Sequence, residues 1–210
     1  MSEVCNTLIM DKEPGFTLVE LLVTIVVATI LLAVGVPAFQ SFIKNNRVTA
    51  QTNDLVSAIQ LARSEALKRG VNTVVCASID QKSCSNNKDT WAAGWIVFSD
   101  LNRNNVLDID NTDAGECQAT EDCVIKTSNG LSHGSTLETV AASSLCFLPT
   151  GLSGTNTSST PTSCTTEASK IASVQFILKA KNCEKNQARK VEITDKGHTQ
   201  VSTCETCACS

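Results

Sequence analysis

FTLVELLVTIVVATILLAVGVPAF, residues 16–39, is the stretch that decides the fold. It is 24 residues long and carries a single charge, on Glu20. As an α-helix it would extend roughly 36 Å, enough to cross a hydrocarbon core of about 30 Å. Its β-branched residues also suit a strand, but strands of this length are not found in soluble domains. The segment therefore predicts a membrane-spanning helix.

Glu20 lies one turn into this helix, where a carboxylate in hydrocarbon is costly unless it is paired or near the interface. One interpretation is an ordinary anchor helix with a tolerated interfacial acid. The preceding residues favour a different interpretation, a helix that follows a leader peptide, because residues 1–15 form a polar segment ending in KEPG. A secretory signal peptide has the opposite order, with its apolar region before the cleavage site.

The sequence GFTLVE, residues 15–20, resembles the processing site of type IV prepilins and type II secretion pseudopilins. It has Gly before the cut, Phe after it and the acidic residue four positions further on, with Pro14 where the family usually has Lys or Arg. The resemblance implies that a prepilin peptidase cuts between Gly15 and Phe16 and methylates the new N-terminus at Phe16. It also implies that the apolar helix is kept and packs in a filament. There Glu20 would neutralise the amine of a packed neighbour, since unpaired charges in an apolar core are costly.

Gly35-Val36-Pro37 lies near the end of the apolar stretch. Pro37 has no N–H to donate to the carbonyl of Ala33, so a kink or local melting of the helix is expected. One interpretation is a proline simply tolerated in a membrane helix. The resemblance instead gives Pro37 a role in assembly, because the family also has Gly and Pro here and can loosen this segment in filaments.

Residues 44–70 change character. Val48, Leu55, Ile59, Ala62 and Ala66 recur at helical spacing with polar residues between them, which predicts an amphipathic helix with one buried face. Gly70 is expected to end it as a C-cap, after basic residues in the last turn.

The segment ARSEA, residues 62–66, followed by Arg69-Gly70, is similar to a segment of the GspH/FimT/FimU branch of this family. In that branch it joins the helix to the first strand. The branch resemblance implies a minor pilin or pseudopilin, since major pilins usually look different.

The rest of the chain has the pattern of strands. They are expected at 71–79, 91–99, 122–127, 145–148, 173–180, 189–194 and 198–202, with a hairpin turn at Asp195-Lys196-Gly197. WAAGWIVFS followed by DLNRN, residues 91–104, also resembles a hairpin of the GspH branch. The predicted class is α+β, a long N-terminal α-helix packed on an antiparallel β domain. Residues 150–169 contain twelve hydroxyl residues in twenty and are expected to form a surface loop.

The expected organisation is a leader at 1–15, a transmembrane and polymerisation helix at 16–43, an amphipathic helix at 44–70 and a disulfide-rich β domain at 71–210. Eleven cysteines are too many for a reducing compartment unless they bind metal. Removing the leader removes Cys5 and leaves ten candidates for disulfides: Cys76, Cys84, Cys117, Cys123, Cys146, Cys164, Cys183, Cys204, Cys207 and Cys209. Short loops favour Cys76–Cys84 and Cys117–Cys123. The remaining pairings stay open. An alternative for the CETCAC tail, residues 204–209, is that its cysteines form part of a zinc or iron–sulfur site.

Few residues suit catalysis or metal binding. Oxygen side chains at Asp100, Asn102, Asn104, Asp108 and Asp110 suit calcium by their alternation, but the expected Gly and bidentate Glu are absent, so an ordinary Asx-rich turn is favoured. The two histidines, His133 and His198, lie in polar contexts with no motif and are expected at the surface. We predict no enzyme activity, no cofactor and no metal site.

Charge is spread unevenly along the chain, whose net charge is −4. Residues 71–169 carry 4 basic and 11 acidic residues, whereas residues 170–198 carry 7 basic and 3 acidic residues. A basic C-terminal hairpin suits phosphate contacts. FimT-like members bind DNA through a Gly-Arg-x-Arg motif here, and the matching residues of this chain retain only Arg189, followed by Lys190. These two are candidate DNA contacts, with a solvated basic face as the alternative.

The sequence therefore predicts a minor pilin that primes or caps a type IV pilus. A DNA-uptake pilin and a type II secretion pseudopilin remain as alternatives. The expected partners are the prepilin peptidase, other major and minor pilins, the inner membrane and, less strongly supported, DNA. The resemblance implies a single-pass inner-membrane precursor with a periplasmic domain, which then moves to the tip or base of the pilus.

Overall fold

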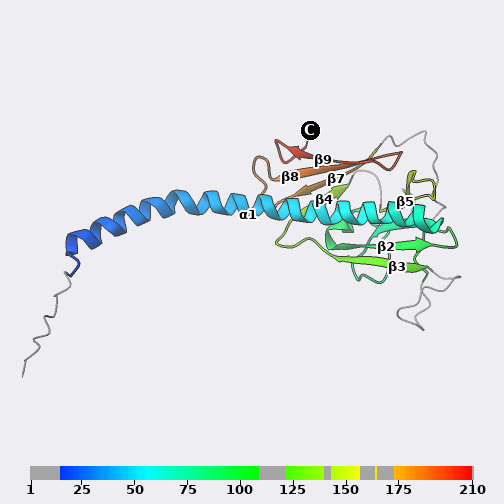
Figure 1. Cartoon of the computed structure of the whole chain (residues 1–210), viewed down its shortest axis with the longest axis horizontal. Coiled ribbons are helices and arrows are strands. Elements are labelled where there is room, and N and C mark those ends of the chain that lie inside the picture. The colour runs from blue at the N-terminus through cyan, green and yellow to red at the C-terminus, as the bar shows by residue number, and fades with distance from the viewer. Residues whose placement is uncertain (1–14, 109–121, 140–142, 157–163, 165–172, 210) are drawn as a thin grey trace, which may run out of the picture. The chain divides into compact units, whose positions relative to one another are not determined.

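A computed structural model describes residues 15–108, 122–139, 143–156, 164 and 173–209. The chain divides into two units, one ending at Phe42 and the other beginning at Ile43. Helix α1 (Leu18–Arg69) contributes residues to both (Figure 1). The helix precedes two antiparallel sheets, which confirms the predicted α+β class.

In the unit before Ile43, the described residues are 15–17 and the first part of α1, whose apolar side chains are exposed. The helix runs without a break through Pro37. Local melting, one of the two alternatives predicted at this proline, therefore does not occur in this structure.

The first sheet of the second unit has five antiparallel strands in the order β3-β2-β1-β5-β6. They are β1 (Asn72–Ala77), β2 (Gly94–Asp100), β3 (Cys123–Asn129), β5 (Ser144–Phe147) and β6 (Ser153–Asn156). Every residue of β1 and β2 is buried. A strand can be buried along its full length only when both faces of its sheet are covered.

The second sheet has four antiparallel strands in the order β4-β7-β8-β9. They are β4 (Thr136–Thr139), β7 (Ser173–Lys179), β8 (Ala188–Thr194) and β9 (Thr199–Cys204). Burial alternates strictly along β7, so this sheet turns one face to the core. In Figure 1 its strands lie above α1, and β2 and β3 lie below it.

The predicted buried face of the helix is confirmed. Val48, Leu55, Ile59, Ala62 and Ala66 are all buried, in one core with residues of both sheets. The 3₁₀ helix η1 (Lys88–Ala93) contributes Trp91, whose ring meets that of Phe176 edge to face with centroids 4.9 Å apart. Gly70 has a φ of +70° and donates its N–H to Ala66, as the C-cap prediction required.

The outer face of the five-stranded sheet carries a second apolar cluster. Val74, Cys76, Ile96, Phe98 and Cys146 form it, and Cys84, Leu107 and Cys164 pack against it from the covering segments. These side chains alternate along β1 and β2 with the core residues, so each strand serves two apolar layers.

Three details of the strand prediction are wrong. Residues 91–93 belong to η1 and not to a strand, because the Asn87 side chain caps this helix and accepts the N–H of Asp89 at 2.9 Å. Strand β4 was not expected. Strand β6 lies within the Ser/Thr-rich stretch predicted as a loop, and it forms because β5 offers it an edge to pair with. Residues 157–163 and 165–169 of that predicted loop lie outside the described residues.

Candidate assembly site

Helix α1 begins with a capping interaction that involves the one charged residue of the apolar stretch. Oγ1 of Thr17 accepts the backbone N–H of Glu20 at 3.2 Å. Thr followed three residues later by Glu is the spacing of a capping box. This N-cap role of Thr17 was not predicted, although the TLVE spacing carries the signal for it. The first turn of a helix also favours a carboxylate electrostatically.

The residues around the predicted cleavage point are accessible. Gly15 and Glu20 are exposed, and the Phe16 side chain is 83% exposed. The Glu20 carboxylate has no ion-pair partner among the described residues. The geometry thus leaves both the predicted cleavage point and the carboxylate open to other molecules.

An apolar surface follows along α1. Its exposed side chains include Leu18, Val19, Leu21, Leu22, Ile25, Ile30, Leu31, Leu32, Val34, Phe39 and Phe42. Within the described part of the chain, α1 alone is long and apolar enough to cross a membrane, by length and composition. A contiguous apolar surface of this extent requires lipid or protein to cover it.

In the second unit, Arg63 joins the helix to two turns of the sheets. Its Nε donates to the carbonyl of Gly151 at 3.2 Å, and its Nη2 donates to the carbonyl of Lys196 at 3.1 Å. Gly197 completes this arrangement. Its φ is +71°, which favours glycine, and a Cβ at this position would lie only 2.5 Å from the Gly151 carbonyl oxygen. We call Arg63, Gly151, Lys196 and Gly197 the turn clamp. Arg63 therefore binds carbonyl groups, and it forms no ion pair among the described residues.

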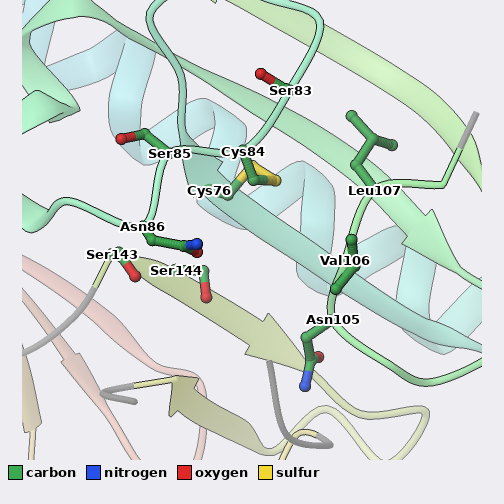
Figure 2. A pocket seen from close by; sticks show the side chains of 10 residues that line it. All are labelled: Cys76, Ser83, Cys84, Ser85, Asn86, Asn105, Val106, Leu107, Ser143 and Ser144. Atoms are coloured by element: carbon green, nitrogen blue, oxygen red, sulfur yellow. A yellow bond between two sulfur atoms is a disulfide. The ribbon is translucent and has the colours of Figure 1, made fainter. Parts of the chain in front are cut away.

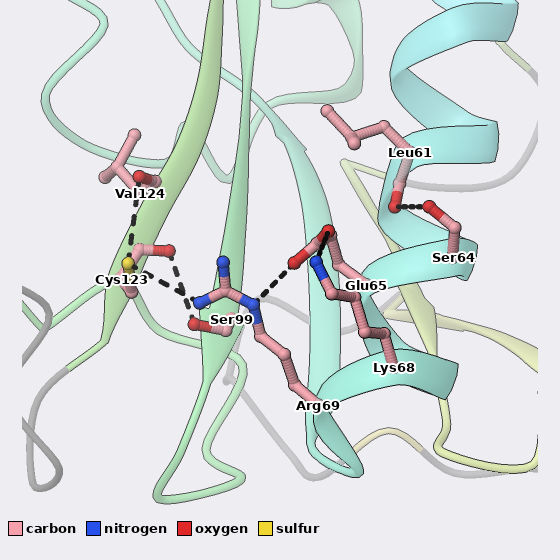
Figure 3. A network of polar contacts seen from close by, with 8 residues as sticks. All are labelled: Leu61, Ser64, Glu65, Lys68, Arg69, Ser99, Cys123 and Val124. Atoms are coloured by element: carbon pink, nitrogen blue, oxygen red, sulfur yellow. Dashed lines mark hydrogen bonds and ion pairs between the residues drawn. The ribbon is translucent and has the colours of Figure 1, made fainter.

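Arg69, at the end of the same helix, faces the five-stranded sheet (Figure 3). Its Nε donates to the Glu65 carboxylate at 2.5 Å, and Nη1 lies 3.9 Å from Sγ of Cys123 on β3. Lys68 makes a longer contact with the same carboxylate, at 3.8 Å. The segment that resembles the GspH branch thus fixes the end of the helix to both sheets.

Asp54 ties the middle of the helix to β3. Its carboxylate accepts the Ser128 hydroxyl at 2.6 Å and Nζ of Lys126 at 2.9 Å. Burial acts to raise the pKa of Asp54, but these two hydrogen bonds and the Lys126 charge outweigh it and hold the pKa below its usual value.

Arg189, a candidate DNA contact, is only 9% exposed. Its Nη2 donates to Oδ1 of Asn45 at 2.6 Å and to Oγ1 of Thr49 at 3.1 Å, both on α1. Nη1 donates to the carbonyls of Asn186 and Ala188. The guanidinium is thus engaged in joining β8 to the helix. Lys190 is half-buried and lies 3.8 Å from Glu192.

The four disulfides whose cysteines are both described lie in two regions. Cys76–Cys84 and Cys146–Cys164 lie on the outer face of the five-stranded sheet, where they hold covering segments over the second apolar cluster. Cys183–Cys207 and Cys204–Cys209 tie the C-terminal tail down. The predicted Cys76–Cys84 pair is confirmed. Cys123 is disulfide-bonded, and its predicted partner Cys117 lies outside the described residues. Because the tail cysteines are oxidised, they are not available as metal ligands.

A small pocket of about 190 Å³ opens beside the Cys76–Cys84 bond (Figure 2). Hydroxyl and amide groups line it together with two apolar side chains: Ser83, Ser85, Asn86, Asn105, Val106, Leu107, Ser143 and Ser144. None of these residues titrates near neutral pH, so the lining offers neither a nucleophile–base pair nor an acid–base pair.

The acidic loop after β2 satisfies its own backbone. The Asp100 carboxylate accepts the N–H groups of Asn104 and Asn105 at 3.1 and 3.0 Å, and Asp108 accepts the Asn102 and Asn104 side-chain amides. Burial raises the pKa of Asp100 despite these hydrogen bonds. This pattern is typical of an Asx-rich turn. Asp110 lies outside the described residues, and the part of the chain that is described contains no cluster of metal-ligating side chains.

Both histidines are at the surface, as predicted. His133 is exposed in a turn with a φ of +60°, and His198 is exposed where β9 begins. The predicted hairpin turn at 195–197 is also present, with the Thr194 N–H donating to the His198 carbonyl at 2.9 Å.

Two family models match this chain. One, described as prokaryotic N-terminal methylation motif, matches residues 10–36. The other, described as type II transport protein GspH, matches residues 51–179, more than half of the chain. The chain belongs to the GspH family. In this family member, the matched segment includes Arg63, Arg69 and the whole five-stranded sheet, and it ends with β7, so that β8, β9 and the cysteine-rich tail lie beyond it.

Curated relatives of this GspH-family chain are similar over a short stretch. Prepilin peptidase-dependent protein D of Escherichia coli (strain K12) is 39% identical over 59 residues, 27% of this chain and 40% of that protein. A fimbrial protein of Pseudomonas aeruginosa is 32% identical over 69 residues, 33% of this chain and 44% of that protein. The chain thus spans less than half the length of these relatives. The crystal structure of the type IV minor pilin FimU of Pseudomonas aeruginosa (strain PAO1) covers 79% of this chain and 98% of its own, with 16% identity and a TM-score of 0.48.

Proposed function

We propose that this GspH-family chain is a minor pilin that primes or caps assembly of a type IV pilus. The observation that carries the proposal is the exposed apolar part of α1 with Glu20 as its one charge, continued by a helix fixed to both sheets. A subunit built this way holds its neighbours through the first part and presents the β domain outside. We propose that Pro37 eases rearrangement of the apolar helix as subunits pack, since its missing N–H removes a helix hydrogen bond.

Processing precedes assembly in this proposal. A prepilin peptidase removes residues 1–15 and methylates the amine of Phe16. Gly15 and Phe16, on the two sides of the cut, are both exposed. The precursor spans the inner membrane once, with the β domain in the periplasm, and the mature chain then joins other pilins at the tip or base. Four described disulfides fit an oxidising compartment for that domain.

Glu20 then acts as the counter-charge for the Phe16 amine of an adjacent subunit. Two opposite charges that would each be costly in an apolar core become tolerable when they are paired. The capping contact of the Thr17 side chain with the Glu20 N–H holds the first turn of the helix in the position from which the carboxylate projects.

The test compares Glu20→Ala, Glu20→Gln and Glu20→Asp in cells that assemble the pilus. We expect Ala and Gln to abolish incorporation into sheared filaments, and Asp to retain part of it, while cleavage at Gly15 and folding of the β domain are unchanged. Mass spectrometry of the membrane fraction reports cleavage and methylation separately from assembly. Normal incorporation of Glu20→Gln would overturn the counter-charge role, and a mature chain with residues 1–15 intact would overturn the processing step.

The same cells separate this role from the two alternatives. A pseudopilin is required for secretion and not for piliation, so deletion of the gene would abolish export of secretion substrates and leave pili intact. A DNA-uptake role would require DNA binding that weakens steeply with salt and is lost in an Arg189→Ala/Lys190→Ala variant. The contacts of Arg189 with Asn45 and Thr49 give that role no support.

A further inference from the structure

A second pocket, of about 400 Å³, lies in the unit that begins at Ile43. Three segments build it. Lys44 and Arg47 come from α1, His133 and Ser135 from the loop between β3 and β4, and residues 180–182 from the turn that follows β7. The lining therefore brings three basic side chains and a histidine together from distant parts of the sequence.

These cations are not neutralised within the described residues. Lys44, Arg47 and Lys181 form no ion pair there, although Lys179, two residues before Lys181, pairs with Glu138 at 2.7 Å. Lys44 and Arg47 are half-buried, so part of their hydration is already lost. Grouped cations without an acidic partner create a positive potential that favours an anion.

The walls of this pocket are held by specific contacts. The Gln51 side chain donates to the Ser132 carbonyl at 3.4 Å and lies 3.3 Å from its hydroxyl, which joins the β3–β4 loop to the helix. Lys181 packs over Gly134, where a Cβ would come within 2.9 Å of the lysine Cδ. The arrangement of the basic groups is thus a feature of the folded domain.

The place of the pocket next to the apolar part of α1 in the sequence indicates which kind of anion it binds. Lys44 directly follows the exposed apolar side chains of Phe42 and Ile43 at the end of the apolar part of α1. Basic residues next to a membrane-spanning helix lie at the level of the lipid headgroups. We propose that this pocket binds the phosphate of an anionic phospholipid headgroup. The inference rests on the membrane insertion included in the proposed function.

The test uses the full chain in nanodiscs of phosphatidylglycerol and phosphatidylcholine. The chain is extracted in mild detergent, and native mass spectrometry measures the ratio of the two lipids that remain bound. Each Lys or Arg near an anionic lipid surface contributes about fivefold to the affinity. We expect Lys44→Gln/Lys181→Gln to lower the enrichment of phosphatidylglycerol at least fivefold. The matched control Lys82→Gln/Lys88→Gln also removes two lysines and should retain it.

Three results would overturn the proposal. The first is equal enrichment in the wild-type chain and the pocket variant. The second is displacement of phosphatidylglycerol by an equal concentration of inorganic phosphate, which would identify a site for free phosphate. The third is absence of enrichment in the wild-type chain together with a cross-link from Lys181 to an acidic residue of another subunit in filaments. Failure to enter nanodiscs at all would instead contradict the proposed membrane insertion, so the two failures are distinguishable.

Discussion

Arg189 donates from Nη2 to Oδ1 of Asn45 at 2.6 Å, across 144 residues of sequence. The bond joins a strand of the four-stranded sheet to the second unit's part of α1. On the other side of the helix, Asp54 makes the corresponding link to β3 through Lys126 and Ser128. Charged groups that look like surface residues in the sequence thus add a specific link from the helix to each sheet beside the shared apolar core.

Arg189→Ala is predicted to destabilise the fold. The change removes charged hydrogen bonds to Asn45 and Thr49 and leaves their oxygens partly buried, which should lower the free energy of unfolding by about 3 kcal/mol. Arg189→Lys should retain only part of the stabilisation that Arg189→Ala loses, because an ammonium group cannot reproduce the planar fork of donors. Chemical unfolding of the full chain in detergent measures both effects.

Lys190→Ala is the matched control for that experiment. Its side chain is half-buried and its ion pair with Glu192 is long, at 3.8 Å, so we expect a change within about 0.5 kcal/mol. If Arg189→Ala left the unfolding free energy unchanged but abolished DNA binding, the structural role assigned to Arg189 would be contradicted.

Gly197→Ala is predicted to open the turn clamp. Alanine is strained at a φ of +71°, and its Cβ would crowd the Gly151 carbonyl and Nε of Arg63. Gly70→Ala shares the strain, with a φ of +70°, but no atom lies within 4 Å of its Cβ. We expect Gly197→Ala to cost about 1–3 kcal/mol more than Gly70→Ala in thermal or chemical unfolding, because overpacking adds to the strain. Equal losses of unfolding free energy in Gly197→Ala and Gly70→Ala would mean that the turn clamp tolerates a methyl group.

Much of this fold could be predicted because the deciding signals are local. Helical periodicity identified the buried face from Val48 to Ala66, and Gly70 marked its end. A short loop between Cys76 and Cys84 was enough to favour their pairing. In each case the residues that decide the structure lie within a few turns or one short loop of one another.

The remaining features depend on distant partners. Trp91 looks like part of a strand, but the Asn87 cap and the edge contact with Phe176 on β7 favour a 3₁₀ turn there. Strand β6 has no apolar pattern of its own and forms on the edge of β5. The contacts of Arg63 and the basic pocket at Lys44 each join segments that no local pattern connects.

Asp54 gives the fold a specific dependence on acid. Because the pKa of this carboxyl is lowered on folding from its ordinary 3.8, its contribution to stability is present above that value and is lost as the pH falls through the lower folded pKa. Asp100 and Asp122 act in the opposite sense, since burial raises their pKa and their ionisation disfavours the folded state as the pH rises. We expect Asp54→Asn to lose stability relative to wild type at pH 6, and the difference to shrink between pH 4 and pH 2.

Unfolding of the full chain in detergent at each pH measures this difference. Asp89→Asn is the control, because the Asp89 carboxylate is exposed and its ion pair in the described part of the chain is with its exposed neighbour Lys88. A difference between wild type and Asp54→Asn that stays constant across the acid range would show that the Asp54 contacts do not depend on its charge.

The two kinds of disulfide are predicted to differ in what they stabilise. Cys76–Cys84 closes a loop of separation 8 and Cys204–Cys209 one of separation 5, so loop closure alone gives similar contributions of about 2–2.5 kcal/mol. The first bond also holds its covering segment over Ile96 and Phe98. Cys76→Ala/Cys84→Ala should therefore cost about 4 kcal/mol and expose apolar surface to a hydrophobic dye. Cys204→Ala/Cys209→Ala should lower the free energy of unfolding by about 2 kcal/mol without dye binding. Equal losses in the two variants would show that the outer apolar cluster does not depend on the Cys76–Cys84 bond.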